Sequence, residues 1–400
     1  MLMLKALRRR SIRLLWGGQA LSSIGDEIYR VALIWLAVGL IGEDTGYLAA
    51  AQSGSLLALS LVGGHWADSW DHRRTMIGVD ALRGALVLAP VAAFYLGRVT
   101  LPLLFVVAIS LSALSAFFEP ALQATLPDVS PDVETLQAAT GLMSTTVRLA
   151  RAVGPAVVGL LAPLVPTIHF FTLDSLSFGV SALSVARLAP SRRAAPPAHR
   201  PKGSFRDSLG GGLRAISGDP LMRDLMLVRF LVGGFWSLSY GLGLALLARA
   251  LAPGDVRAFG YAVACYGLGN VAGALGAGNM RRRRPVALAC FGYLFMGAGF
   301  LAMGLAPDRF WLGVACVAGG VGGPVSDLPF VDLVQSRFPI ADLPKLFRLR
   351  MAAETGAGLL LMSASPFLFR AYSPRVVILA CGAAFTAIGL TFFAAHGAAE

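Results

Sequence analysis

The chain has 400 residues, of which 56% are hydrophobic and only 14% are charged, and its formal net charge is +12. Soluble domains usually carry about 25% charged residues, so this chain has too few charges to cover a water-exposed surface. The composition therefore excludes an ordinary soluble domain and indicates long apolar segments within a lipid bilayer.

Apolar runs separated by turn residues predict two sets of membrane-spanning helices, since roughly 20 apolar residues cross a bilayer. We expect an all-α membrane protein with twelve transmembrane helices in two six-helix bundles. The bundles would comprise residues 1–189 and 218–400, joined by a cytoplasmic loop at 190–217. The runs are 14–38, 46–68, 75–97, 101–124, 136–163 and 167–189, then 222–248, 256–279, 285–306, 309–333, 349–370 and 374–396.

The positions of Lys and Arg predict the orientation, because cytoplasmic loops are enriched in these residues. They gather before the first run, at Arg73 and Arg74, in the 190–217 loop and at 281–284. We therefore expect both termini in the cytoplasm and no nucleic-acid partner. The basic start leads into a full-length apolar run without a cleavage site, which predicts a first spanning helix and no signal peptide. Residues 204–216 are expected to form a short helix at the membrane surface.

A weak internal repeat relates the two halves. Gln123 and Pro127 recur 212 residues later as Gln335 and Pro339. This repeat fits two halves related by an axis along the membrane normal, with a substrate cavity between them.

The loop after the second run reads GHWADSWDHRR over residues 64–74. It resembles the G-x-L-A-D-R-x-G-R-R signature of the major facilitator superfamily, although Ser69 and Asp71 replace the Arg and Gly of that pattern. In the family, the Asp pairs with basic residues and helix ends to hold a cytoplasmic gate. The resemblance and the neighbouring charges assign a gate role to Gly64, Asp68, Arg73, Arg74, Asp80, Arg83 and Glu119.

The fifth run contains Gly154, Pro155 and Gly159 in the order G-P-x-x-x-G, which resembles the antiporter motif of drug/proton antiporters. Glycine lets helices approach closely and proline bends them, so helix packing alone is the alternative explanation. Further segments resemble the branch that includes the enterobactin exporter and macrolide efflux pumps. They are LWxxQ at 15–19, FEPAxQ at 118–123 and DSLSF at 174–178.

Charged residues within the apolar runs are functional candidates, because a charge in a membrane helix is costly. Asp26 lies about 20 Å beyond Arg13 along the first helix, on one stripe with Gln19 and Arg30. Asp26 or Glu27 would take part in proton coupling or substrate binding. The alternative is a structural ion pair with Arg30 or with the arginines of the fifth run.

Three further residues lie within later runs. Arg148 and Arg151 share a helix face and would bind an anionic substrate or pair with carboxylates, and Gln19 is a further substrate contact. Asp174, in the sixth run, is a second candidate for protonation. In the second half, the charged residues Arg229, Asp327, Asp332 and Glu354 are expected to form an inner gate.

The family resemblance implies a proton-coupled exporter of a siderophore or a drug-like compound, working by alternating access in a bacterial inner or plasma membrane. We expect a monomer with a small-molecule substrate and protons as partners, surrounded by lipid. Scattered His and Cys residues and the lack of a Walker A motif predict no enzyme activity, metal or cofactor. A transport-inactive receptor or scaffold, and an uptake transporter, remain the alternatives.

Overall fold

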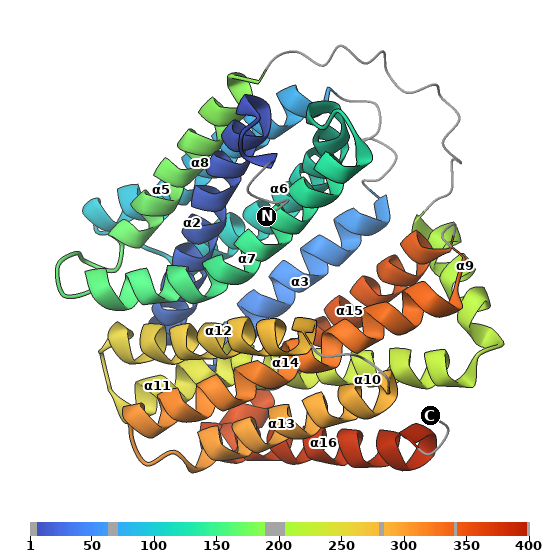
Figure 1. Ribbon diagram of the computed structural model, residues 1–400. Coiled ribbons are helices and arrows are strands. Elements are labelled where there is room, and N and C mark those ends of the chain that lie inside the picture. Colours follow the sequence, from blue (N-terminus) through green and yellow to red (C-terminus); the bar gives the residue numbers. More distant parts are fainter. Residues whose placement is uncertain (1–5, 63–70, 189–204, 280–283, 340–341, 398–400) are drawn as a thin grey trace. The chain divides into compact units, whose positions relative to one another are not determined.

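The computed structural model describes residues 6–62, 71–188, 205–279, 284–339 and 342–397, and every regular element in these residues is a helix (Figure 1). The first helices are α2 (Arg10–Ile41), the 3₁₀ turn η1 (Gly42–Asp44), α3 (Thr45–Val62), α5 (His72–Tyr95), α6 (Leu101–Val129), α7 (Val133–Leu161) and α8 (His169–Ala186). Then come α9 (Phe205–Ser217), α10 (Pro220–Trp236), the π-helical turn η2 (Ser237–Gly243), α11 (Leu244–Leu251), α12 (Val256–Asn279), α13 (Pro285–Leu305), α14 (Arg309–Arg337), α15 (Leu343–Ala371) and α16 (Pro374–His396).

A helix lies along each apolar run that the sequence indicated, although the run at 46–68 continues beyond the described residues. Among the described residues, 8 helical segments are long and apolar enough to cross a membrane. Helix α2 is not among them, and it carries Asp26, Glu27 and Arg30 close together. The all-helical fold is confirmed, while the count of twelve spans stays a prediction. Helix α9 coincides with the expected short helix, and its place at the membrane surface also stays a prediction.

Several helices begin at a side chain that caps their first turn. Asp71 accepts a hydrogen bond from Arg74 N at the start of α5, and Asp132 accepts one from Thr135 N at the start of α7, both at 2.7 Å. Such caps satisfy backbone N–H groups that have no partner within the helix. The same Thr135 N–H holds the pKa of the exposed Asp132 carboxyl below its ordinary value.

The chain packs as two compact units. The N-terminal unit comprises residues 1–33 and 58–205, and the C-terminal unit comprises residues 34–57 and 206–400. The chain thus leaves the N-terminal unit within α2 and returns to it within α3. No sequence pattern indicated that the 34–57 segment packs with the later helices.

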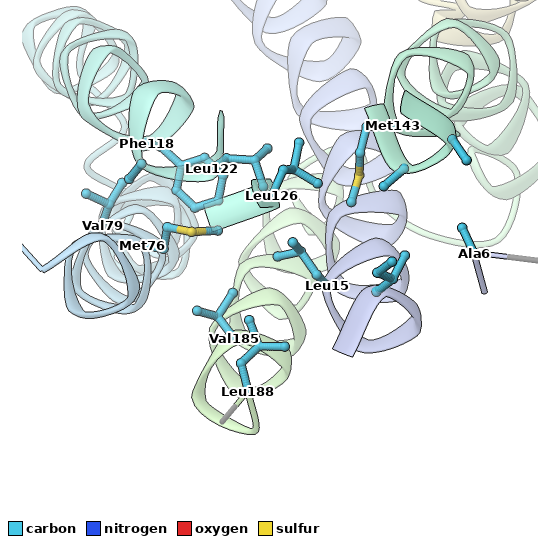
Figure 2. Close-up of a cluster of buried hydrophobic side chains, with 14 residues drawn as sticks. Ala6, Leu15, Met76, Val79, Phe118, Leu122, Leu126, Met143, Val185 and Leu188 are labelled. Carbon is cyan, nitrogen blue, oxygen red and sulfur yellow. The ribbon is translucent and has the colours of Figure 1, made fainter. Parts of the chain in front are cut away.

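One end of the N-terminal unit is filled by an apolar core (Figure 2). Leu15 of α2, Met76 of α5, Leu126 of α6 and Val185 of α8 converge there, and each is at most 1% exposed. Phe118 of α6 belongs to the same core. Burying these side chains fixes the ends of the helices against one another.

The C-terminal unit depends on close helix contacts at glycine. Helix α14 packs against both α12 and α13. A Cβ atom at Gly269 of α12 would lie 2.1 Å from Val317 O, and one at Gly299 of α13 would lie 2.2 Å from Gly319 Cα. Backbones can approach this closely because the glycine at each contact has no Cβ atom.

The 34–57 segment packs against α11, α12 and α15 of the C-terminal unit. Trp35 stacks on Phe259 with the ring centroids 6.2 Å apart, and the Arg249 guanidinium lies 5.5 Å from the Trp35 ring. A Cβ atom at Gly46 would lie 1.9 Å from Ser365 Oγ. Asp44 of η1 forms an ion pair with Arg370 near the end of α15. A stacked pair, an ion pair and a glycine contact therefore hold this segment.

Gly269→Ala is expected to lower the stability of the protein by about 1–3 kcal/mol, because the new methyl group meets the α14 backbone, which cannot yield like a flexible side chain. The matched control is Gly276→Ala on the same helix, where a Cβ atom meets nothing within 4 Å. Thermal unfolding of the detergent-solubilised protein measures both. Equal midpoints for the two variants would contradict the close contact between α12 and α14.

Candidate functional site

Polar side chains from three helices of the N-terminal unit meet along one line, which we call the polar seam. Its members on α2 recur every three or four residues and so share a helix face, while the surrounding positions are apolar. Glycine allows the contact, because a Cβ atom at Gly25 would lie 2.6 Å from Asp174 Oδ1. The seam comprises Gln19, Ser22, Asp26 and Tyr29 of α2, Asp80 and Arg83 of α5, and Asp174, Ser177 and Ser181 of α8.

Asp174 is fully buried in the seam. Ser177 Oγ lies 3.3 Å from its Oδ1, and its Oδ2 has no hydrogen-bond partner among the described residues. The Tyr29 hydroxyl is likewise buried without such a partner there, and Asp174 and Asp26 both act on it electrostatically. A carboxylate with so few partners is costly to keep ionised in an apolar surrounding.

Asp80 is the second fully buried carboxyl of the seam. Its Oδ1 lies 3.9 Å from Arg83 Nη1, which is an ion contact without hydrogen-bond distance. Ser181 is its neutral polar neighbour, and that hydroxyl accepts a hydrogen bond of 2.9 Å from Gln19 Nε2. The contact between Gln19 and Ser181 connects α2 to α8. The sequence predicts a cytoplasmic gate role for Asp80 and Arg83, and no pattern in it links them to Asp174.

Asp26 differs from the two buried carboxyls because it is exposed. It makes no ion pair or hydrogen bond among the described residues, while Arg83, Glu27, Arg30 and Glu119 act on it through their charges. The sequence left open a structural ion pair of Asp26 or Glu27 with Arg30 or with an arginine of the fifth run. The structure forms that pair at Glu27, which contacts Arg30 on the same helix, and not at Asp26. Asp26 is therefore an accessible carboxyl beside buried ones.

Glu27 lies between two arginines, since Arg151 Nε of α7 is 4.0 Å from its Oε1 in addition to the contact with Arg30. Gly154 makes this possible, because a Cβ atom there would lie 2.5 Å from Glu27 Cβ. Pro155 is buried beside it, whereas a Cβ atom at Gly159 would meet nothing within 4 Å. The two glycines of the motif thus have different surroundings.

The remaining candidates lie apart from the seam. Arg148 is half-buried and forms no ion pair among the described residues. Arg73 donates hydrogen bonds to the carbonyls of Val185 and Ala186, and so satisfies the C-terminal end of α8. Arg74 is exposed, and the exposed Glu119 accepts a hydrogen bond of 3.0 Å from Gln123. Gly64 and Asp68, the other gate candidates, lie outside the described residues.

The C-terminal unit contains a charged network that joins α10, α14 and α15. Arg229 Nε donates to Glu354 Oε1 at 2.7 Å and Arg229 Nη2 donates to Asp327 Oδ1 at 3.1 Å. Arg350 bonds to the same two carboxylates, and both guanidiniums lie over the Phe330 ring. The expected inner gate did not include Arg350, although its i,i+4 spacing to Glu354 favours an ion pair. Two cations and two anions balance one another here.

Arg229→Met is expected to destabilise the protein by about 3–5 kcal/mol, because it leaves two partly buried carboxylates with one cation. Adding Glu354→Met should recover part of the loss, which a double-mutant cycle of unfolding midpoints measures. Arg337→Met is the control, since its 3.1 Å pair with Asp219 is largely exposed and such pairs contribute at most about 1 kcal/mol. Purely additive losses would contradict the network.

Solved structures share this fold at low sequence identity. A POT family transporter in complex with a thioalcohol-conjugated peptide superposes with a TM-score of 0.73 at 12% identity, covering 96% of both chains. The nucleoside transporter NupG gives a TM-score of 0.71 at 12% identity, covering 96% of this chain and 98% of NupG. At this identity the likeness concerns the fold alone.

Sequence relatives are efflux proteins. The multidrug efflux pump Tap of Mycobacterium tuberculosis (strain H37Rv) is 30% identical over 268 residues, which cover 61% of this chain and 63% of Tap. Macrolide efflux protein A of Streptococcus pyogenes is 28% identical over 179 residues, covering 43% of each chain. The matches therefore span less than two thirds of either relative.

A family model described as a transmembrane secretion effector of the major facilitator superfamily matches residues 3–328. This range includes the whole polar seam and most of the helices. The chain is a multi-pass membrane protein and belongs to this family, the transmembrane secretion effectors of the major facilitator superfamily.

Proposed function

We propose that the protein exports a small organic molecule and couples this export to proton entry. The observation that supports proton coupling is the surplus of carboxyl groups in the polar seam. Asp26, Asp80 and Asp174 act on one another electrostatically, and Arg83 is the one cation of the seam. One guanidinium can balance one carboxylate, so the two fully buried carboxyls, Asp80 and Asp174, share a single cation within the seam.

The exposure of the three carboxyls supports separate roles. Asp26 is accessible and would exchange protons with water, whereas Asp80 and Asp174 are fully buried and would hold protons behind it. The Ser177 hydroxyl lies 3.3 Å from Asp174 Oδ1 and is suited to pass a proton to or from that carboxyl. Proton uptake would then change the charge within α2, α5 and α8 together.

Coupling requires that protons and substrate bias the same two conformations. In alternating access, the protonated and deprotonated seam would favour different states, and the substrate would bind one of them better. The names of the relatives support a drug-like substrate. Arg148 and Arg151 of α7 could bind an anionic group of the substrate, because Arg151 is 52% exposed and Arg148 is half-buried.

Asp26→Asn and Asp174→Asn are each expected to abolish drug-driven proton flux in proteoliposomes, because the amide cannot exchange a proton. Glu43→Gln of η1 is the matched control, since this acidic residue lies outside the seam, and it should retain the flux. A panel with a macrolide, a lipophilic cation and a catechol-type siderophore defines the substrate class. Wild-type drug transport that ignores an imposed pH gradient would contradict proton coupling.

Gly154→Ala is expected to reduce the same flux strongly, because a methyl group there pushes α7 away from α2 at Glu27. Gly159→Ala, in the same motif, adds a methyl group in open space and should leave both flux and unfolding midpoint near their wild-type values. Equal losses of flux in the two variants would contradict a specific role for the contact of Gly154 with α2.

A further inference from the structure

We infer that Arg83 is a positioning residue for proton coupling: its guanidinium, clamped between α6 and α8, sets the pH range in which the carboxyls of the polar seam take up and release protons. This inference rests on the function proposed above. It moves Arg83 from the cytoplasmic gate, where the sequence had assigned it, to the coupling machinery.

A hydrogen bond fixes one edge of the guanidinium. Arg83 Nη2 donates to Ser115 Oγ of α6 at 2.6 Å. The Ser115 hydroxyl is itself held, because it donates to Leu111 O at 2.9 Å and so turns its lone pairs toward Arg83. The acceptor is thus fixed by the α6 backbone, and the arginine has a defined anchor outside the seam.

Two aromatic rings fix the guanidinium further. The Arg83 Cζ atom lies 4.9 Å from the centroid of Phe118 on α6 and 5.5 Å from that of Phe178 on α8. The side chain is only 7% exposed, so these ring contacts replace much of its hydration. Phe118 also belongs to the apolar core, which keeps its ring in place (Figure 2).

This anchoring keeps Arg83 from neutralising any one carboxyl completely. Its contact with Asp80 spans 3.9 Å, and its charge also acts on Asp26 and Asp174. A fixed cation among several carboxyls favours the ionised form of each, and so it opposes proton uptake by the whole seam. The charged groups that face these carboxyls are Glu27 and Arg30 of α2, Arg83 of α5 and Glu119 of α6, together with the three carboxyls themselves.

The charge of Arg83 and the fixed position of its guanidinium can be tested with separate variants. We call the three contacts with Ser115, Phe118 and Phe178 the clamp. Arg83→Gln removes the charge, whereas Arg83→Lys keeps the charge and loses the planar fork that spans Ser115 and the two rings. Phe178→Leu keeps the arginine and removes one wall of the clamp. A purely structural role would lower the stability or the amplitude of transport in all three without changing the pH dependence.

The experiment uses whichever of the macrolide, the lipophilic cation and the catechol-type siderophore the wild type transports. It measures proton flux driven by that compound in proteoliposomes over a range of pH, together with the protons released when the compound binds to the detergent-solubilised protein. Arg83→Gln should move the pH midpoint of both quantities upward by about 1–3 units, because the carboxyls keep their protons to higher pH without the cation. Arg83→Lys and Phe178→Leu should give smaller upward shifts. Arg98→Gln is the control, because this exposed arginine lies just beyond the end of the same helix and outside the seam, and it should leave the midpoint unchanged.

The outcomes separate this inference from the proposed function. Coupled flux with the wild-type midpoint in Arg83→Gln, or in Arg83→Lys and Phe178→Leu if the first variant does not fold, would overturn the role of Arg83 and leave proton coupling intact. Drug transport without proton flux in the wild type would overturn both.

Discussion

Arg83 lies among the carboxyls of Asp26, Asp80 and Asp174 in the N-terminal unit, and two of these carboxyls, Asp80 and Asp174, are fully buried with it. Buried charges need partners or protons, so the helices that carry them must approach closely enough to share hydroxyls. Gly18 and Gly25 permit this approach, since Cβ atoms there would lie within 3 Å of Ser184 and Ser177. Close packing at these glycines thus brings the polar groups of α2 within reach of the serines of α8.

In the C-terminal unit, the charged network has as many cations as carboxylates, in contrast to the seam. Arg229 and Arg350 share the carboxylates of Asp327 and Glu354, and the four groups balance without added protons. Such a balanced network joins the helices, and each of its carboxylates already has a cation as partner. The contrast supports proton coupling in the N-terminal unit and a mainly structural role for the charges of the C-terminal unit.

The sequence predicts the helices and several site residues but not the pairing between them. Apolar runs locate helices because membrane length and composition are local properties, and α16 coincides with the run predicted at 374–396. Partner choice is not local: spacings of three and four residues both place side chains on one helix face, so Arg30 could pair with Glu27 or Asp26. The link between Asp80, Arg83 and Asp174 depends on how α5 and α8 face each other, which no single helix reveals.

The contact between α7 and α2 connects the G-P-x-x-x-G segment of α7 to the residue beside Asp26. Gly154 lies against α2 at Glu27, the residue next to Asp26, and Arg151 of α7 reaches the same carboxylate. A shift of α7 cannot leave Glu27 unmoved, because the two backbones touch where a methyl group would not fit. Movement of α7 would therefore change the distances between Asp26 and its charged neighbours. By this route a substrate held by the arginines of α7 would alter proton binding on α2 without touching the buried carboxyls.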